Sequence, residues 1–227
     1  MKPIYEPKGA AKEYGDYAIN IYTGCPHRCY YCFAPSVLRR DRETFHAHVE
    51  PRPGIVEAVQ KQLEREQITG KTIHLCFTCD PYPTGYDSSA TREIIKLLKE
   101  HGNHVQILTK GIESHRDFDI LDENDWYGVT LDGVSYVRDR CLVQNLRFAH
   151  GVGIETWVSF EPVIDAQATL FQINEVGFVD KVKIGKLNYH HSDINWAAFG
   201  RAAEEHCQRL GLDYYIKDSL RREMEAG

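Results

Sequence analysis

The densest group of chemically reactive residues in this sequence is a set of three cysteines near its start. Cys25, Cys29 and Cys32 lie in the segment Tyr-Thr-Gly-Cys-Pro-His-Arg-Cys-Tyr-Tyr-Cys, a C-x3-C-x2-C spacing that follows an apolar stretch. Three thiolates this close on one loop suit a soft metal centre. In a cubane of four irons, three protein ligands leave one iron open, and an open position separates reactive metal sites from structural ones.

Other cysteines allow two alternative metal sites. A zinc ribbon would combine Cys29-x2-Cys32 with Cys76-x2-Cys79, but the 43 intervening residues far exceed the usual spacing of about 15 to 20. Cys76 and Cys79 lie on or just past an expected strand. If both lie on it, they face opposite sides, so they could share a metal only if the strand ended between them. A closed electron-transfer cluster would instead take a fourth ligand from Cys76, Cys79 or Cys141. Both alternatives stay open at this point.

The elements that must position these residues alternate along the chain between strands and helices. Strands separated by helices imply a parallel sheet with right-handed crossovers, and six or seven such units predict an α/β open sheet or barrel. In both architectures ligands bind at the carboxyl ends of the strands. The expected strands are Ala18–Tyr22, Thr72–Phe77, His104–Leu108, Trp126–Leu131, Glu155–Phe160, Lys181–Ile184 and Asp213–Ile216.

Helix signals fill the gaps between these strands. An apolar stripe begins at Ile55, and a helix capped by Ser88 or Ser89 ends near Gly102. A third helix leads to Gly151, and Cys141 is expected in a polar loop before it. The clearest helix carries an apolar stripe from Trp196 to Leu210, with Ser192 or Asp193 before it and Gly211 after it.

Composition excludes several classes of protein. The chain has 227 residues, 42% hydrophobic and 26% charged, which are ordinary globular values that exclude a disordered chain. No stretch has the ~18 apolar residues of a membrane span, and the N-terminus lacks the apolar core of a secretory signal. We therefore expect a cytoplasmic protein with no membrane partner.

The net charge of −6 argues against a surface that coats long duplex DNA. A compact basic run, Arg39, Arg40 and Arg42, lies near the cysteines; it is suited to phosphates or to a solvated helix face.

The cysteine motif resembles that of the radical S-adenosylmethionine (SAM) superfamily, including the aromatic Tyr31 before the last cysteine. Tyr22-x-Gly-Cys25-x-His27-x-Cys29-x-Tyr31-Cys32 is similar to the spore photoproduct lyase-related branch. So are Thr78-x-Asp80-Pro81-Tyr82 and Leu108-Thr-Lys110, which follow the second and third strands. The segments Val158-Ser-Phe-Glu161-Pro162 and Tyr214-Tyr-Ile-Lys217 resemble radical SAM proteins of phages and mobile elements.

This resemblance implies a fold and a cofactor set. Cys25, Cys29 and Cys32 would hold a [4Fe–4S] cluster, and SAM would chelate the fourth iron. One electron would cleave SAM to methionine and a 5′-deoxyadenosyl radical, which abstracts hydrogen from a substrate. The implied fold is a partial (β/α)6-type barrel, here a single domain over residues 1–227 with its core at about 17–217. A reductant such as flavodoxin or ferredoxin would supply the electron.

The resemblance also implies roles for residues at the strand ends. Tyr31 would contact adenine through its backbone. Asp80, supported by Thr78, would accept hydrogen bonds from the SAM ammonium, although the family's usual glycine pair is replaced by Cys76-Phe-Thr-Cys79. Lys110 would neutralise the SAM carboxylate.

The fourth and fifth strands carry further candidates. Thr130 and Asp132 would hold the ribose hydroxyls. Ser159 and Glu161 share one face of their strand and would contact ribose, adenine or substrate, because a buried carboxylate needs a partner. The alternative for Glu161 is a salt bridge to Lys183 or Lys217.

The remaining cysteines and the substrate are less determined. Cys207 lies on an apolar helix stripe and is expected in the core, while Cys79 and Cys141 are weak candidates for hydrogen donors. The paired His190 and His191 either contact substrate or face solvent.

The lyase-like branch implies a nucleic-acid or nucleotide substrate, and the short chain ends predict a large or tethered one. The alternative functions are an iron–sulfur electron-transfer or sensor protein without SAM cleavage, and a zinc-bound nucleic-acid module.

Overall fold

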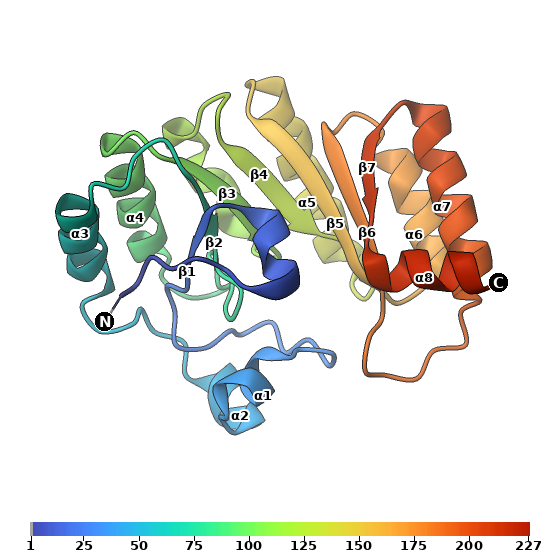
Figure 1. The fold of residues 1–227 in the computed structure, drawn as a ribbon, viewed down its shortest axis with the longest axis horizontal. Coiled ribbons are helices and arrows are strands. Elements are labelled where there is room, and N and C mark those ends of the chain that lie inside the picture. The colour runs from blue at the N-terminus through green and yellow to red at the C-terminus, as the bar shows by residue number, and fades with distance from the viewer. Residues whose placement is uncertain (1) are drawn as a thin grey trace. The chain divides into compact units, whose positions relative to one another are not determined.

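The computed structural model describes residues 2–227, and seven strands follow one another through a single sheet in chain order (Figure 1). The strand pairs β1–β2, β2–β3, β5–β6 and β6–β7 are parallel. The strands are β1 Tyr17–Ile19, β2 Thr72–Leu75, β3 His104–Thr109, β4 Trp126–Thr130, β5 Glu155–Val163, β6 Lys181–Lys186 and β7 Asp213–Ile216. The α/β fold class is confirmed, and each expected strand has a counterpart in this order.

The chain divides into two compact units, residues 1–126 and residues 127–227. In the first unit, the helices are η1 Gly9–Tyr14, α1 Ala34–Leu38, α2 Arg42–Ala47, α3 Ile55–Glu66, α4 Ser89–Glu100 and the 3-10 segment η2 Ile112–Ile120. In the second unit, they are α5 Tyr136–Gly151, α6 Ala166–Glu175, α7 Trp196–Leu210 and α8 Asp218–Ala226. None of the helices within residues 2–227 is both long and apolar enough to cross a membrane.

The core of the first unit is built on β2 and β3. Ile73 pairs with Val105 and Leu75 with Ile107 in the register of β2 and β3, and all four side chains are fully buried. The apolar stripe of α3, which includes Val59, is buried as its helical spacing predicts. This core leaves the ends of β1, β2 and β3 to carry polar side chains.

The second unit repeats the pattern with β5, β6 and β7. Phe160 lies opposite Ile184 in the β5–β6 register, and both are fully buried. Helix α7 ends at Leu210 and is followed by Gly211, as expected; this glycine adopts the left-handed conformation. The helix begins after Asn195, whose side chain accepts the Ala198 amide. Asn195 is thus the cap in place of Ser192 or Asp193.

Cys141 and the end of the second strand differ from expectation, and one helix was not predicted. Cys141 lies inside α5, because Ser135 caps the helix earlier and Leu142 lies on its buried stripe. The charged C-terminal segment, for which the sequence indicated no element, forms α8 and buries Leu220. Strand β2 ends at Leu75, so Cys76 and Cys79 both lie beyond it, and the opposite-face argument does not apply to them.

Candidate metal and cofactor site

The three motif cysteines lie on the loop that leaves β1 and enters α1. All three are half-buried free thiols. Helix α2 holds this loop through its backbone: the Cys25 amide donates to the Phe45 carbonyl at 3.4 Å, and buried His46 donates from Nδ1 to the Cys25 carbonyl at 2.7 Å. A Cβ atom at Gly24 would lie 2.2 Å from the Phe45 carbonyl oxygen, so only glycine permits this approach.

Arginine side chains hold the other carbonyls of the cysteine loop. Arg42 donates to the Cys29 carbonyl and, at 3.3 Å, to the Cys32 carbonyl. Arg40 donates to the Thr23 carbonyl. The basic run near the cysteines therefore includes two guanidinium groups that fix the loop and place positive charge beside it.

Lys110, which follows β3, brings an ammonium group to the cysteine loop. Its Nζ lies 3.5 Å from Cys29 Sγ, donates to the Tyr31 hydroxyl and stands 4.7 Å from the centre of the Tyr31 ring. The side chain is buried, so this charge acts at short range in a poorly screened environment. A cation here stabilises thiolates and an anionic group of a bound ligand.

Asp80 joins the cysteine loop to the ends of β2 and β3. One oxygen accepts the Tyr82 amide at 2.8 Å and the Thr109 hydroxyl at 2.5 Å. The other accepts the Lys110 amide at 2.8 Å and lies 3.3 Å from His27 Nδ1. Burial works to raise the pKa of this carboxyl, but His27 and the donated hydrogen bonds hold it below its ordinary value. Asp80 is therefore a junction of three segments.

Thr78 carries a buried hydroxyl with no hydrogen-bond partner in the described part of the chain. Its backbone is fixed, because Asn20 Oδ1 accepts the amides of Phe77 and Thr78 at 2.9 and 2.8 Å. Buried polar atoms normally have partners, so an orphan here points to a group that binds beside it.

Cys76 and Cys79 lie directly after β2. Cys76 adopts a left-handed backbone, φ 71°, which is uncommon outside glycine. Cys79 Sγ accepts the Tyr22 amide at 3.4 Å. Burial raises the pKa of Cys76 well above its ordinary value; at Cys79 burial acts in the same direction, but Cys76 and the Tyr22 amide hold the pKa below it.

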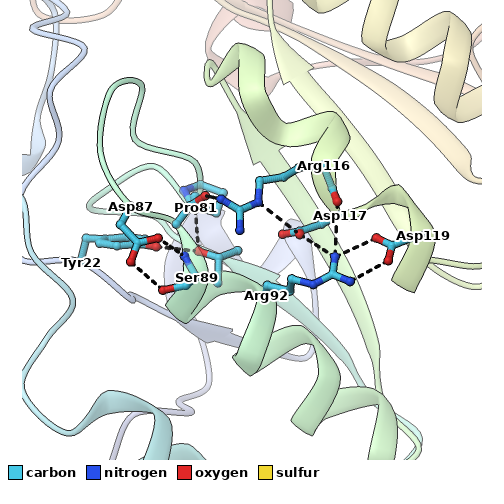
Figure 2. Close-up of polar contacts among 10 residues, drawn as sticks. Tyr22, Pro81, Asp87, Ser89, Arg92, Arg116, Asp117 and Asp119 are labelled. Atoms are coloured by element: carbon cyan, nitrogen blue, oxygen red, sulfur yellow. Dashed lines mark hydrogen bonds and ion pairs between the residues drawn. The ribbon is translucent and has the colours of Figure 1, made fainter.

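A polar network joins α4 to Tyr22, which precedes the cysteine loop, and to Pro81, which follows Asp80 (Figure 2). The Tyr22 hydroxyl donates to Thr91 Oγ1 at 3.0 Å, and the Thr91 hydroxyl donates to the Pro81 carbonyl at 2.5 Å. Farther along α4, Arg92 forms ion pairs with Asp117 at 2.9 Å and Asp119 at 2.6 Å. The turn that carries Asp80 is therefore anchored by α4.

In the second unit, Glu161 near the end of β5 forms an ion pair with Lys217, which precedes α8, at 2.6 Å. The Glu161 side chain is 25% exposed, and it lies so close to Gly185 that a Cβ there would be 2.9 Å from its carboxyl carbon. Lys183, the other lysine considered for this pair, stands over the Trp157 ring at 5.2 Å.

The other expected residues of the second unit lie at two strand ends. Thr130 and Ser159 are buried, and the Ser159 carbonyl accepts the Leu131 amide at 3.1 Å. Asp132 pairs with Arg138 and accepts the Val134 amide at 3.1 Å, so it organises the start of α5. Cys207 is fully buried in α7, as expected, while His190 and His191 are exposed.

The first unit thus collects a donor set suited to an iron–sulfur cluster and an amino-acid-like ligand. Three free thiols lie on one braced loop, and Lys110 and the orphan Thr78 hydroxyl accompany them. The residues fit the group. The sequence did not indicate which residues support the loop: His27 is part of the cysteine motif but had no predicted role, and His46 and Asn20 belong to no motif. Spacing identifies ligands but not the residues that hold a loop.

Comparison with known proteins agrees with this donor set. The Radical SAM superfamily profile matches residues 19–163, more than half of the chain. The uncharacterized protein Rv2578c of Mycobacterium tuberculosis is 31% identical over 112 residues, which cover 47% of this chain and 33% of that protein. The uncharacterized protein ORF301 of Acidianus two-tailed virus is 30% identical over 129 residues, covering 52% of this chain and 42% of that protein.

The match therefore spans less than half the length of either relative. In this chain, the region that matches the superfamily profile runs from the last residue of β1 to the end of β5. On that extent of match, and with the cysteine loop placed as described, the chain belongs to the radical SAM superfamily.

Proposed function

We propose that this chain is a radical SAM enzyme that generates a radical for hydrogen abstraction from a substrate. A single observation carries the proposal: the Lys110 ammonium lies 3.5 Å from Cys29 Sγ, beside the ligands of the expected cluster. A buried cation at that place suits the carboxylate of a SAM molecule bound to the open iron. When bound, the [4Fe–4S] cluster supplies the electron that cleaves SAM to methionine and a 5′-deoxyadenosyl radical.

In this proposal the first unit binds and orients the cofactors. Cys25, Cys29 and Cys32 are the cluster ligands. Lys110 holds the carboxylate of SAM, and the orphan Thr78 hydroxyl is available to the same ligand. Tyr31 stays the expected neighbour of adenine.

In this proposal Asp80 positions neighbouring residues and does not itself bind the cofactor. Both of its oxygens already receive protein donors, so we assign it the placement of His27 and Lys110. Direct contact between Asp80 and the SAM ammonium would have to replace one of these donors.

The second unit supplies further contacts in the proposal. Thr130, Ser159 and Glu161 are assigned to ribose, adenine or substrate. Two observations on Glu161 support this: its side chain is 25% exposed, and it lies two residues before the end of β5, where a ligand can reach it and compete for the ion pair with Lys217. Cys79 and Cys141 remain candidates for hydrogen donation to a substrate radical.

The proposal extends to the branch and the substrate class. The three lyase-like motifs interlock through Asp80, which touches His27 of the first motif and Thr109 of the third. This supports a relationship to the spore photoproduct lyase branch, and with it a nucleic-acid or nucleotide substrate. All seven cysteines are free, which supports a reducing, cytoplasmic location.

The test is anaerobic reconstitution with iron and sulfide, followed by dithionite and SAM. We expect 5′-deoxyadenosine by mass spectrometry, and we expect Cys25→Ala, Cys29→Ala or Cys32→Ala to abolish both this product and the visible charge-transfer absorption. Cys207→Ala is the matched control and should retain both. A cluster that forms without 5′-deoxyadenosine would favour the electron-transfer or sensor alternative, and equal dependence on Cys76 or Cys79 would contradict an open iron.

A further inference from the structure

A second group of cysteines, Cys76 and Cys79, forms a C-x2-C segment directly after β2, outside the cysteine loop. Both ends of this segment are hydrogen-bonded to the chain at the end of β1. The Cys76 amide donates to the Ile19 carbonyl at 2.8 Å, and Cys79 Sγ accepts the Tyr22 amide at 3.4 Å. The segment is therefore held along a stretch of only four residues.

The chain bends between the two cysteines. Asn20 Oδ1 accepts the amides of Phe77 and Thr78 at 2.9 and 2.8 Å, which fixes the bend. Cys76 begins it in a left-handed backbone conformation, φ 71°. The backbone amide of Ile21 lies beside both cysteine sulfurs and acts to lower the pKa of each. The two sulfurs therefore share one backbone donor and are neighbours across the bend.

The two thiols differ in exposure and in ionisation. Cys76 is 6% exposed, whereas Cys79 is half-buried. Burial works to raise the pKa of both, and the interaction between them raises the pKa of Cys76 further and lowers that of Cys79. In a C-x2-C pair the thiol with the lower pKa attacks first, and the other thiol completes the disulfide. Cys79 is accordingly the attacking thiol.

Arg52, which lies just before α3, adds a cation and hydrogen-bond donors to this pair. Its amide donates to the Ile21 carbonyl at 2.8 Å, and its positive charge acts to lower the pKa of Cys79. Within residues 2–227 the guanidinium forms no ion pair, and its buried Nε has no hydrogen-bond partner. A guanidinium with available donors suits a carboxylate. The ligand expected beside Cys79 therefore carries an acidic group.

We propose that Cys76 and Cys79 are a redox-active dithiol that exchanges with a small acidic disulfide of the glutathione type, whose carboxylate Arg52 binds. The Cys79 thiolate attacks one sulfur of glutathione disulfide, a mixed disulfide forms, and one glutathione thiolate leaves. Cys76 loses its proton to solvent and attacks the Cys79 sulfur, so that the internal disulfide forms and the second glutathione thiolate leaves. Two electrons pass from the protein to glutathione, and the leaving thiolates take up protons from solvent.

The experiment uses the reconstituted chain without oxygen, with glutathione as the probe. The protein is equilibrated at different ratios of reduced to oxidised glutathione, alkylated and digested with trypsin. Cleavage after Lys71 and Arg92 releases a peptide that contains Cys76, Cys79 and no other cysteine. Its mass distinguishes the dithiol, the mixed disulfide and the internal disulfide. This readout needs no SAM cleavage, so it stays valid if the proposed function fails.

We expect the wild-type peptide to shift reversibly between the dithiol and the internal disulfide as the glutathione ratio changes. Cys76→Ser should stop at a mixed disulfide on Cys79, because the second thiol is missing. Cys79→Ser should leave the buried Cys76 unmodified. Cys207→Ser, in the core of α7, is the matched control and should behave as the wild type.

The role of Arg52 is tested by rate. Arg52→Ala should slow formation of the mixed disulfide with glutathione by about tenfold, as loss of a charge-assisted contact does. The effect should be smaller with hydroxyethyl disulfide, which has no carboxylate. Arg65→Ala, at an exposed position on α3, is the matched control and should keep the wild-type rate. Equal rates with glutathione in Arg52→Ala and wild type would overturn the assignment of Arg52.

Three results would overturn the proposed dithiol. The first is a peptide that stays in the dithiol form at every glutathione ratio. The second is glutathione that remains on Cys79 in the wild type without an internal disulfide, which would make Cys79 a single reactive thiol. The third is reaction of the peptide only after the cluster is removed, which would make Cys76 or Cys79 a metal ligand.

Discussion

Two carboxylates lie near strand ends, Asp80 after β2 and Glu161 in β5, and they differ in burial and in the number of donors that contact them. Asp80 is buried, and its oxygens contact donors from the cysteine loop, its own turn and the end of β3. Glu161 is 25% exposed and forms an ion pair at 2.6 Å with Lys217, whose side chain is 12% exposed. Asp80 therefore connects parts of the protein to one another, whereas Glu161 can exchange its lysine partner for a ligand.

The difference separates two uses of the same chemical group. A buried carboxylate with several donors fixes the relative positions of the segments that donate to it. A partly exposed ion pair contributes little to stability and can be broken at small cost. We therefore expect Asp80 to govern the stability of the first unit, and Glu161 to govern ligand binding more than stability.

The largest expected effect is that of Asp80→Ala. Removing one partner of a buried charged network costs about 3–5 kcal/mol, because the remaining donors are left unpaired in the interior. Urea unfolding at pH 7 would measure this loss, and Glu161→Ala is the matched comparison. Equal losses in the two variants would remove the distinction between the two carboxylates.

The next effect is that of Lys110→Ala on the cofactor. A charge-assisted contact contributes about 1.5–3 kcal/mol, so SAM affinity should fall roughly tenfold to a hundredfold while the cluster still assembles. Calorimetry with SAM on the reconstituted protein measures it. Lys181→Ala removes a surface ion pair with Asp213 and should leave the affinity unchanged. An unaltered affinity in Lys110→Ala would place SAM at other strand ends.

A smaller effect concerns pH. The folded-state pKa of Asp80 is lowered, so its ionised form stabilises the fold above the unfolded pKa of about 3.9, and this contribution is lost as pH falls through the folded value. The gap in unfolding free energy between wild type and Asp80→Asn should therefore narrow as pH falls from 7 toward 3. A gap that stays constant over that range would show that the carboxyl is not held ionised by folding.

The smallest expected effect on stability is that of Glu161→Gln. Because the ion pair with Lys217 is partly exposed, the unfolding free energy should change by less than about 1 kcal/mol. The same variant should weaken binding of SAM or lower the yield of 5′-deoxyadenosine. A stability loss as large as that of Asp80→Ala, with cofactor binding unaffected, would make Glu161 a structural residue.

The sheet was predictable because its signals are local. Each strand is an apolar β-branched run between helical patterns, and the burial of Val105 follows from the alternation in β3. Helix α8 was missed because its residues are mostly charged and only Leu220 is buried. Cys141 was misplaced because the helix signal of α5 begins at a serine cap that resembles a loop.

For the candidate site, the sequence predicts the metal ligands but not the residues that support them. The ligands follow from spacing, because metal coordination restricts residue type and separation. Their supports do not: His46 and Arg42 reach the carbonyls of Cys25 and Cys29 from α2, a contact set by tertiary packing. Likewise, nothing in the T-x-D-P-Y string shows that protein donors already contact both carboxylate oxygens of Asp80.

The close approach at Gly24 has a consequence for how the metal enters. Ordering a loop residue costs about 1–2 kcal/mol of conformational entropy, which a loop that orders around its metal must lose during loading. Here the backbone of the cysteine loop is docked on α2 through the Phe45 carbonyl, so that cost is met when the polypeptide folds. Cluster insertion then encounters a preorganised set of thiols, and a side chain at position 24 would leave every ligand present yet make loading slow and incomplete.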